Sequence, residues 1–396
     1  MKRAGNNKDK PIPGKWPLLK VLLREVSVIG KDHSLLLTLL IAPLLYAFFY
    51  GSIYINKEEE GVKLAIIDED GSAISRLLIQ QIDHSQATHT ILLSSLQTAQ
   101  EQMYQGNCQG YFYIEKGLGS KILSLKQANV VLAVNAARFL PSSDLIMSLT
   151  QVCLTVGAGV RLQYLQQSQG LNTQASLQEV MPVNVDYRPL FNERSSYGAF
   201  LLPGLLALIL QQTLLIGLSA SVAGERKRDG AAGWMQTAGN NPSVALWGKG
   251  CFYLLLFGVY AFFFLNVNFA ILRLPMRGSH LQLSVAILLF LLTIIPMAQW
   301  IGSMFRQPLL NVQIMAFSTY PIFLITGYTW PLSSLPAVLR GLSWLLPTTP
   351  FIQIYQSIVQ SGAGLSDNIP GLTHLAFLFL FYSTLSLLRL RRLQPR

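Results

Sequence analysis

Charged residues are scarce in this chain of 396 residues. Asp, Glu, Lys and Arg together make up 12% of it, against about 25% in globular proteins. Apolar residues make up 51%, and the mean hydropathy is +0.39. So few charges cannot cover the surface of a soluble protein of this length. The composition therefore excludes an ordinary soluble protein and indicates one that lies in a membrane.

The chain also lacks the motifs that carry common chemistry. It has no Gly-x-x-x-x-Gly-Lys-Ser/Thr run, and Gly248-Lys249-Gly250 lacks the earlier glycine and the hydroxyl that such a phosphate loop needs. His84 and His89 have no cysteine at metal-ligand spacing. Cys108 and Cys153 are compatible with a disulfide or with two free thiols. We expect no catalytic residue, no metal site and no cofactor held by this chain.

Six long stretches contain no Asp, Glu, Lys or Arg at all. They cover residues 34–55, 195–224, 250–272, 281–305, 307–339 and 368–388. The hydrocarbon core of a bilayer takes about 20 apolar residues per helix, so each stretch is long enough to cross it. We predict a mainly α membrane protein with six transmembrane helices. The fifth stretch exceeds one span and contains Pro321, Pro331 and Pro336, so we expect a re-entrant segment near residues 329–350.

Lysine and arginine residues predict the orientation, because the cytoplasmic loops of membrane proteins are enriched in them. With six spans, the leader, the connections after spans two and four, and the tail fall on one side. These segments hold 17 of the 30 basic residues and a net charge of +12, whereas segment 56–193 on the other side has −4. Both termini are therefore expected in the cytoplasm. The net charge of +11 reports orientation, and we expect no binding to nucleic acid.

These assignments divide the chain into four parts. The parts are a cytoplasmic leader (1–33), the first span (34–55), an extracytoplasmic domain (56–193) and a five-span transmembrane domain (194–396). Between Trp16 and Ile29 the leader has apolar and basic residues on separate helical faces, which is typical of a helix in the membrane interface. A simple membrane anchor and a contact with a cytoplasmic partner are both open for this helix.

The segment between the first two spans is predicted to be an α/β domain. Apolar runs that indicate strands alternate with apolar residues at helical spacing. The strands are expected near residues 62–68, 90–93, 110–114 and 129–135, and the first helices near 74–82 and 95–104. A longer helical pattern follows from residue 142 to residue 169.

The cytoplasmic connection after the second span has a dense group of charges. It begins with Gly224-Glu225-Arg226-Lys227-Arg228-Asp229-Gly230 and ends, after a short helix, at Gly248-Lys249. Such a segment is either an ordinary basic flank that sets topology or a docking surface for another protein.

Several motifs, taken in order, resemble the membrane subunit of a type-2 ABC exporter with a large outer domain after the first span. The matching runs include Leu23-Arg24-Glu25 in the leader, Ala65-Ile66-Ile67-Asp68-Glu69-Asp70 in the outer domain, and Glu225-Arg226 through Gly230 to Lys249. Two later runs resemble the family's break after span five and its Pro-Thr turn: Thr326-Gly327-Tyr328-Thr329-Trp330-Pro331 and Leu346-Pro347-Thr348-Thr349-Pro350.

The resemblance implies roles for particular residues. It implies contact with, or coupling to, an ATPase for Arg24, Glu25, Glu225, Arg226, Arg228, Asp229, Gly230 and Lys249. It implies a gate or re-entrant role for Gly327, Pro331, Pro336 and Pro347.

The resemblance also implies partners, location and direction. A cytoplasmic ABC ATPase dimer would bind ATP, and a second permease would complete the path as a homodimer or with a paired paralogue. The chain would lie in the bacterial inner membrane and move a substrate outward, with a periplasmic adaptor and an outer-membrane channel as possible further partners. The alternative is an ion-coupled carrier or channel, which usually has carboxylates inside its spans; here the ionisable groups within the six stretches are His374 and tyrosines.

Overall fold

The computed structural model describes residues 16–53, 61–86, 88–124, 126–169, 190, 197–264, 269–271 and 276–394. The chain forms two compact units. We call Met1–Ile55 with Leu190–Arg396 the helical unit, and Asn56–Pro189 the α/β unit. Each is described by itself below.

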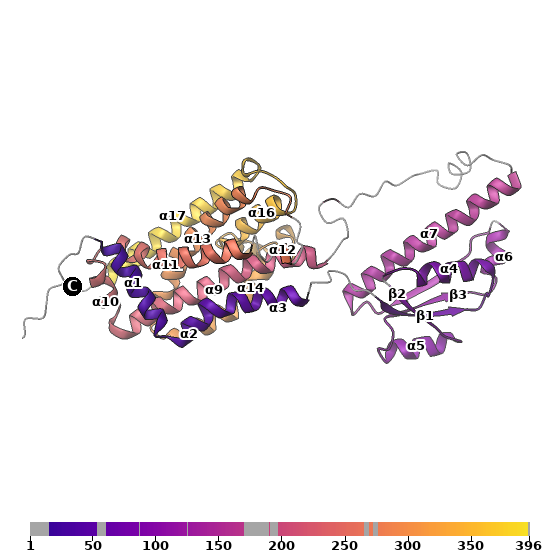
Figure 1. The fold of residues 1–396 in the computed structure, drawn as a ribbon, viewed down its shortest axis with the longest axis horizontal. Helices are drawn as coiled ribbons and strands as arrows, with labels where there is room; N and C mark the ends of the chain where they lie inside the picture. The colour runs from indigo at the N-terminus through magenta and orange to yellow at the C-terminus, as the bar shows by residue number, and fades with distance from the viewer. Residues whose placement is uncertain are drawn as a thin grey trace, which may run out of the picture. The chain divides into compact units, whose positions relative to one another are not determined.

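Long helices that pack side by side build the helical unit (Figure 1). The chain enters through α1 (Pro17–Gly30) and then a continuous helical stretch of α2 (His33–Leu36), a π-helical turn (Leu37–Ile41) and α3 (Ala42–Ile53). The remaining long helices are α9 (Tyr197–Asp229), α11 (Pro242–Phe263), α13 (His280–Gly302), α14 (Pro308–Ile325) and α17 (Ile369–Arg392). α13 packs against α9, α11 and α17, so it occupies the middle of the unit.

Shorter helices connect the long ones. They are α10 (Ala232–Thr237), α12 (Phe269–Ile271), α15 (Ala337–Ser343), α16 (Thr348–Val359) and two 3-10 turns (Leu332–Ser334 and Leu365–Asn368). α16 packs against α13 and α17, and its residues Phe351, Ile352 and Ile354 are buried. The stretch after α14 therefore returns into the helical unit through α16.

Seven helices in the described part of the chain are long and apolar enough to cross a membrane. Six belong to the helical unit and correspond to the six charge-free stretches. The seventh, Pro141–Gln167, lies within α7 (Phe139–Gln169) of the α/β unit. Its Leu145 and Leu149 belong to the core beside the sheet, which gives these apolar positions a role other than contact with lipid. The difference from the predicted count is therefore this one helix.

Two helices that carry residues of the expected docking segment extend well beyond the predicted ends of their spans. α9 continues past residue 224 to Asp229, and α11 begins at Pro242 instead of residue 250. Asn241 caps α11, since its side chain accepts a hydrogen bond from the backbone N–H of Ser243 at 3.0 Å. Glu225 and Lys249 therefore lie within long helices, although the sequence placed both in a loop.

The α/β unit contains a four-stranded sheet in the order β2-β1-β3-β4. β1 (Val62–Asp68) pairs in parallel with β2 (Thr88–Leu92) and β3 (Gly110–Ile114), and β4 (Val130–Val134) pairs antiparallel to β3. One face packs on α4 (Ala73–Asp83), α6 (Leu118–Leu123) and α7, and the other on α5 (Leu96–Tyr104) (Figure 1). The two central strands, β1 and β3, are covered on both faces and read as apolar runs, which is why the sequence revealed them. The three cysteines are free.

A carboxylate joins β1 to the start of α6. Asp70 accepts hydrogen bonds from the backbone N–H groups of Gly117, at 2.8 Å, and Gly119, at 3.0 Å. A hydrogen bond with the Ser72 side chain, followed by that from Gly119, lowers the pKa of Asp70 below its ordinary value of 3.8. A depressed pKa means that ionised Asp70 stabilises the fold fully above the unfolded pKa, and that this contribution disappears as the pH falls through the lower folded value.

Replacing Asp70 by asparagine should therefore loosen the start of α6 at neutral pH and have less effect once the pH falls below the lowered pKa of Asp70 in the folded chain. Hydrogen exchange of the Gly117 and Gly119 amides in the full chain, corrected for intrinsic rates, measures this. Glu101→Gln on α5 is the matched control, because it removes a carboxylate that accepts a hydrogen bond from Gln97 within the same helix. Equal protection of both amides in wild type and Asp70→Asn at pH 7 would contradict the assigned role.

Candidate functional site

The leader helix α1 packs tightly against α11. Val21, Glu25, Val28 and Ile29 are its buried residues. The two helices meet at Gly248, where an added Cβ would lie 2.7 Å from Cβ of Val21 and 3.2 Å from the carbonyl oxygen of Leu18. Only glycine permits this approach. Leu23 of α1 and Trp16, which precedes the helix, remain exposed, as expected of a helix that also meets a membrane interface.

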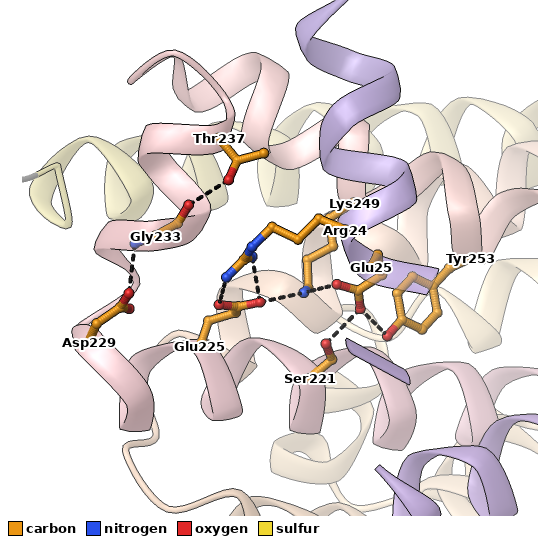
Figure 2. Close-up of polar contacts among 9 residues, drawn as sticks. All are labelled: Arg24, Glu25, Ser221, Glu225, Asp229, Gly233, Thr237, Lys249 and Tyr253. Atoms are coloured by element: carbon orange, nitrogen blue, oxygen red, sulfur yellow. Dashed lines mark hydrogen bonds and ion pairs between the residues drawn. The ribbon is translucent and has the colours of Figure 1, made fainter. Parts of the chain in front are cut away.

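Three helices direct polar side chains to one buried point, which we call the charge cluster: Arg24 and Glu25 of α1, Ser221 and Glu225 of α9, and Lys249 and Tyr253 of α11 (Figure 2). Ser221 and Glu225 are four residues apart on one helix, and so are Lys249 and Tyr253. Residues at this spacing share a helical face. Each of the two long helices therefore presents a pair of polar side chains to α1.

Glu25 receives three hydrogen bonds inside the cluster. The hydroxyls of Ser221 and Tyr253 donate to its Oε1 at 2.6 Å and 2.8 Å, and the ammonium of Lys249 donates to its Oε2. Its side chain is only 1% exposed. A buried carboxylate needs such partners to offset its loss of hydration. Glu25 thus fastens α1 to both α9 and α11.

Glu225 is held by two cations. The guanidinium of Arg24 donates to both of its carboxylate oxygens, at 2.7 Å and 2.8 Å, and Nζ of Lys249 lies 3.6 Å from Oε1. Paired N–H donors on one carboxylate also fix orientation, which a single ammonium does not. Glu225 and Lys249 are both 0% exposed, and Arg24 is 25% exposed. Two positive and two negative charges balance within the cluster.

The short helix α10 closes over the cluster. The chain turns after α9 through Gly230 and Ala231, whose φ values are 69° and 76°, and the side chain of Asp229 accepts a hydrogen bond from the N–H of Gly233 at 2.8 Å. This turn buries Trp234, and Nζ of Lys249 lies 5.2 Å from the centre of its ring. A cation over an aromatic ring is a favourable contact. α10 is therefore tied to the same lysine.

The structure places the residues of the predicted docking surface in different environments. Glu25, Glu225 and Lys249 are buried in the chain's own core, so in this conformation they contact no partner directly. The sequence suggested exposure because charges usually need water; here they satisfy one another. Arg228, Asp229 and Gly230 are exposed. Arg226 lies between these extremes, and its guanidinium donates to the backbone carbonyl of Ser303 after α13.

The predicted gate residues occupy three different environments. Gly327 has φ +88°, and a Cβ there would lie 2.7 Å from Cγ of Leu332, so glycine fits this turn after α14. Pro331 and Pro336 are exposed and precede the 3-10 turn and α15. Pro347 is buried and precedes α16. The four residues lie at successive turns of the chain, and the contacts described for them do not bring them together at one site.

Sequence reasoning missed several residues, both in the charge cluster and near Gly327. Ser221, Tyr253 and Trp234 complete the charge cluster, and four-residue spacing from Glu225 and Lys249 was the available signal for the first two. Near Gly327, the hydroxyl of Tyr328 donates to the carbonyl of Phe200 and accepts from the N–H of Gly204 at 3.1 Å. Nothing local in the sequence connects these residues. Among the residues that the structure describes, no group of three or more His, Cys, Asp or Glu is placed to hold a metal.

Comparison with known proteins agrees with this architecture. The family model described as ABC-2 family transporter protein matches residues 33–388, which is most of the chain. The chain belongs to the ABC-2 transporter family. It is therefore a multi-pass membrane protein and a permease subunit of an ABC transporter.

Individual relatives align with this permease over most of their own length. This permease is 22% identical to the probable multidrug ABC transporter permease YbhS of Escherichia coli (strain K12) over 384 residues, which cover 96% of this chain and 97% of YbhS. It is 23% identical to the linearmycin resistance permease protein LnrN of Bacillus subtilis (strain 168) over 370 residues, which cover 87% and 91%. The probable multidrug ABC transporter permease YbhR of Escherichia coli (strain K12) is also 23% identical, over 359 residues.

Proposed function

We propose that this permease exports a substrate from the cytoplasm or the inner leaflet, driven by ATP hydrolysis in a separate subunit. Family membership supports an ABC transporter, and the absence of a phosphate-binding loop from the sequence supports a separate ATPase. The names of the relatives mention multidrug transport and linearmycin resistance, which favours efflux of a foreign compound. In this proposal the permease lies in the inner membrane, and the distribution of basic residues supports cytoplasmic termini.

The charge cluster is the observation that supports a coupling mechanism. Glu25 and Arg24 fix α1 to α9 and α11, and Lys249 ties α10 to the same point. A push on any of these elements therefore moves a connected body that includes two long helices. Because the charges are buried, the cluster transmits movement and does not itself bind the ATPase. The surface proposed to receive the push is the exposed end of α9 together with the residue that follows it, residues 227–230.

A second permease is part of the proposal. Three apolar helices of the helical unit have little of their most apolar windows buried within one chain: 22% for His33–Ile53, 17% for Pro308–Ile325 and 22% for Leu365–Arg392. Lipid and a second permease would cover these faces, either as a homodimer or with a paralogue. A periplasmic adaptor and an outer-membrane channel would extend the route, and the described contacts of this chain do not require them.

Reversing two exposed charges tests the coupling surface. Lys227→Glu with Arg228→Glu should weaken ATPase binding about tenfold or more, because like charges would face each other where opposite charges met. The matched control reverses two neighbouring exposed arginines at the end of α17, Arg391→Glu with Arg392→Glu. The measurement is permease-stimulated ATP hydrolysis in proteoliposomes that contain both subunits.

Two outcomes would contradict the proposal. Equal stimulation by the two double variants and the wild type would remove the coupling surface from the end of α9. Substrate transport by the permease alone, under an ion gradient and without ATP, would replace export by an ABC pair with an ion-coupled carrier.

A further inference from the structure

A groove of about 650 Å³ lies on the α/β unit. It runs between α4, α6 and the second half of α7, three helices that lie on the same face of the sheet (Figure 1). Its volume is within the range of pockets that hold small molecules, about 300–1,000 Å³. Export through the helical unit makes no use of this groove, so its contents are a separate question.

Apolar side chains form the walls of the groove. They are Ile74, Leu77, Ile122, Leu123 and Val160. Leu77 is 40% exposed and Leu123 is 64% exposed, so the apolar wall is open to water. α7 adds to this exposure, because Pro141–Gln167 is apolar enough for a membrane span but its most apolar window is only 11% buried. Contiguous apolar surface of this kind usually marks a binding site.

Two positive charges accompany the apolar wall. Lys126 and Arg161 both line the groove, and none of the described residues that line it is acidic. The remaining polar lining consists mainly of glutamine side chains, which donate and accept hydrogen bonds without charge. A ligand that fits therefore has an apolar body and a negative end. A neutral oil would leave both cations without a partner, and a simple anion would leave the apolar wall uncovered.

We propose that this groove binds a single-chain anionic amphiphile, whose chain lies on the apolar wall and whose carboxylate pairs with Lys126 and Arg161. Burial of the chain provides most of the affinity, because it removes apolar surface from water. The cations select for charge, because a guanidinium or ammonium near a carboxylate forms strong charge-assisted hydrogen bonds. The site belongs to the α/β unit alone, and the proposal stands or falls independently of export.

The helix α7 offers a matched pair of glycines for the test. Gly157 lines the groove, and a Cβ added there meets no atom within 4 Å. Gly159 is equally unobstructed but does not line the groove, because two residues along a helix point to opposite sides. Leucine at either position improves helix propensity. Only Gly157→Leu places a side chain in the space that the ligand would occupy.

The experiment uses the full chain in nanodiscs of phosphatidylcholine, with dansyl-labelled undecanoic acid as the probe and empty nanodiscs as the background. We expect saturable fluorescence enhancement. Gly157→Leu should raise the dissociation constant about tenfold, and so should Lys126→Glu with Arg161→Glu. Gly159→Leu, and Lys63→Glu on β1 outside the groove, should leave it unchanged. The uncharged methyl ester of the probe should bind about tenfold more weakly than the acid.

Three results would overturn the proposal. The first is equal binding of the methyl ester and the acid, which would show that the cations make no contribution. The second is equal binding by Gly157→Leu and Gly159→Leu, which would place the probe elsewhere. The third is no saturable binding by the wild type. Circular dichroism and elution volume of each variant establish that a loss of binding reflects the site and not unfolding.

Discussion

Replacing Lys249 by methionine is expected to lower the free energy of unfolding of the helical unit by about 3–5 kcal/mol, the usual effect of removing one partner from a buried ion pair. Methionine retains the unbranched shape of the side chain but not its charge. Glu25 and Glu225 would then share a buried site with Arg24 as the one remaining cation of the cluster. The penalty arises from the unpaired carboxylate more than from the lost attraction.

A second variant separates charge balance from packing. Glu25→Gln combined with Lys249→Met removes one charge of each sign and leaves the Arg24 pair with Glu225 intact. We expect this double variant to recover most of the lost stability, as a double-mutant cycle measures for residues in contact. The comparison uses the midpoint of thermal unfolding, which is measured as the temperature at which half of the protein is no longer monodisperse after heating. A double variant less stable than Lys249→Met alone would contradict charge balance as the cause.

The same double variant also addresses coupling. Its α1 would remain attached through Arg24 and Glu225, whereas the bonds from Glu25 to α11 would be weaker. Normal stimulation of the ATPase would then show that the Arg24 pair is sufficient to carry the movement. Reduced stimulation by a variant that is still folded would instead show that the bonds of Glu25 to α11 are also needed for coupling.

The six long helices of the helical unit could be predicted from the sequence because the bilayer excludes charge. Their ends could not be predicted in the same way. Glu225 and Lys249 were assigned to a loop because an isolated charge rarely enters a span, yet each has a partner far along the chain. Arg24 and Glu225 are separated by 201 positions, and Glu25 and Lys249 by 224. Local spacing carries no signal for such pairs.

The same limit explains why the sequence did not separate the buried residues of the expected docking segment from the exposed ones. Every residue from Glu225 to Asp229 is charged, so the sequence offered no reason to divide the run. Helix geometry divides it: Glu225 points to α1, whereas the residues after Arg226 continue beyond the packed core. A charged residue four positions from a small polar residue such as Ser221 was the one local indication of an inward face.

The contact of Tyr328 with α9 was also beyond sequence reasoning. The Gly-to-Pro run after α14 correctly indicated a turn near Gly327. It did not indicate that the next side chain would fold back onto Gly204, where an added Cβ would lie 2.3 Å from the tyrosine ring. Glycine within a long apolar helix has many explanations, and only the three-dimensional contact selects one of them.

Gly302→Ala is expected to have the second large effect, because α9 and α13 meet at this glycine. A Cβ there would lie 2.4 Å from the carbonyl oxygen of Ser219 and 2.8 Å from its Cα. Both atoms belong to the backbone, so no side chain can rotate away and the two helices must separate. Small residues at such crossings are what allow membrane helices to approach closely.

Separation of α9 and α13 would disturb two further contacts. Ser219 accepts a hydrogen bond from Asn311 of α14 at 2.7 Å, and the carbonyl of Ser303, next to Gly302, accepts from Arg226. We expect Gly302→Ala to cost about 1–3 kcal/mol, the usual range for overpacking. Gly258→Ala on α11 is the control, because a Cβ there meets no atom within 4 Å. It should instead add about 0.5–1 kcal/mol through helix propensity. Equal unfolding midpoints for the two alanine variants would mean that α9 and α13 can part without loss, and Arg226 would then not depend on their contact for its position.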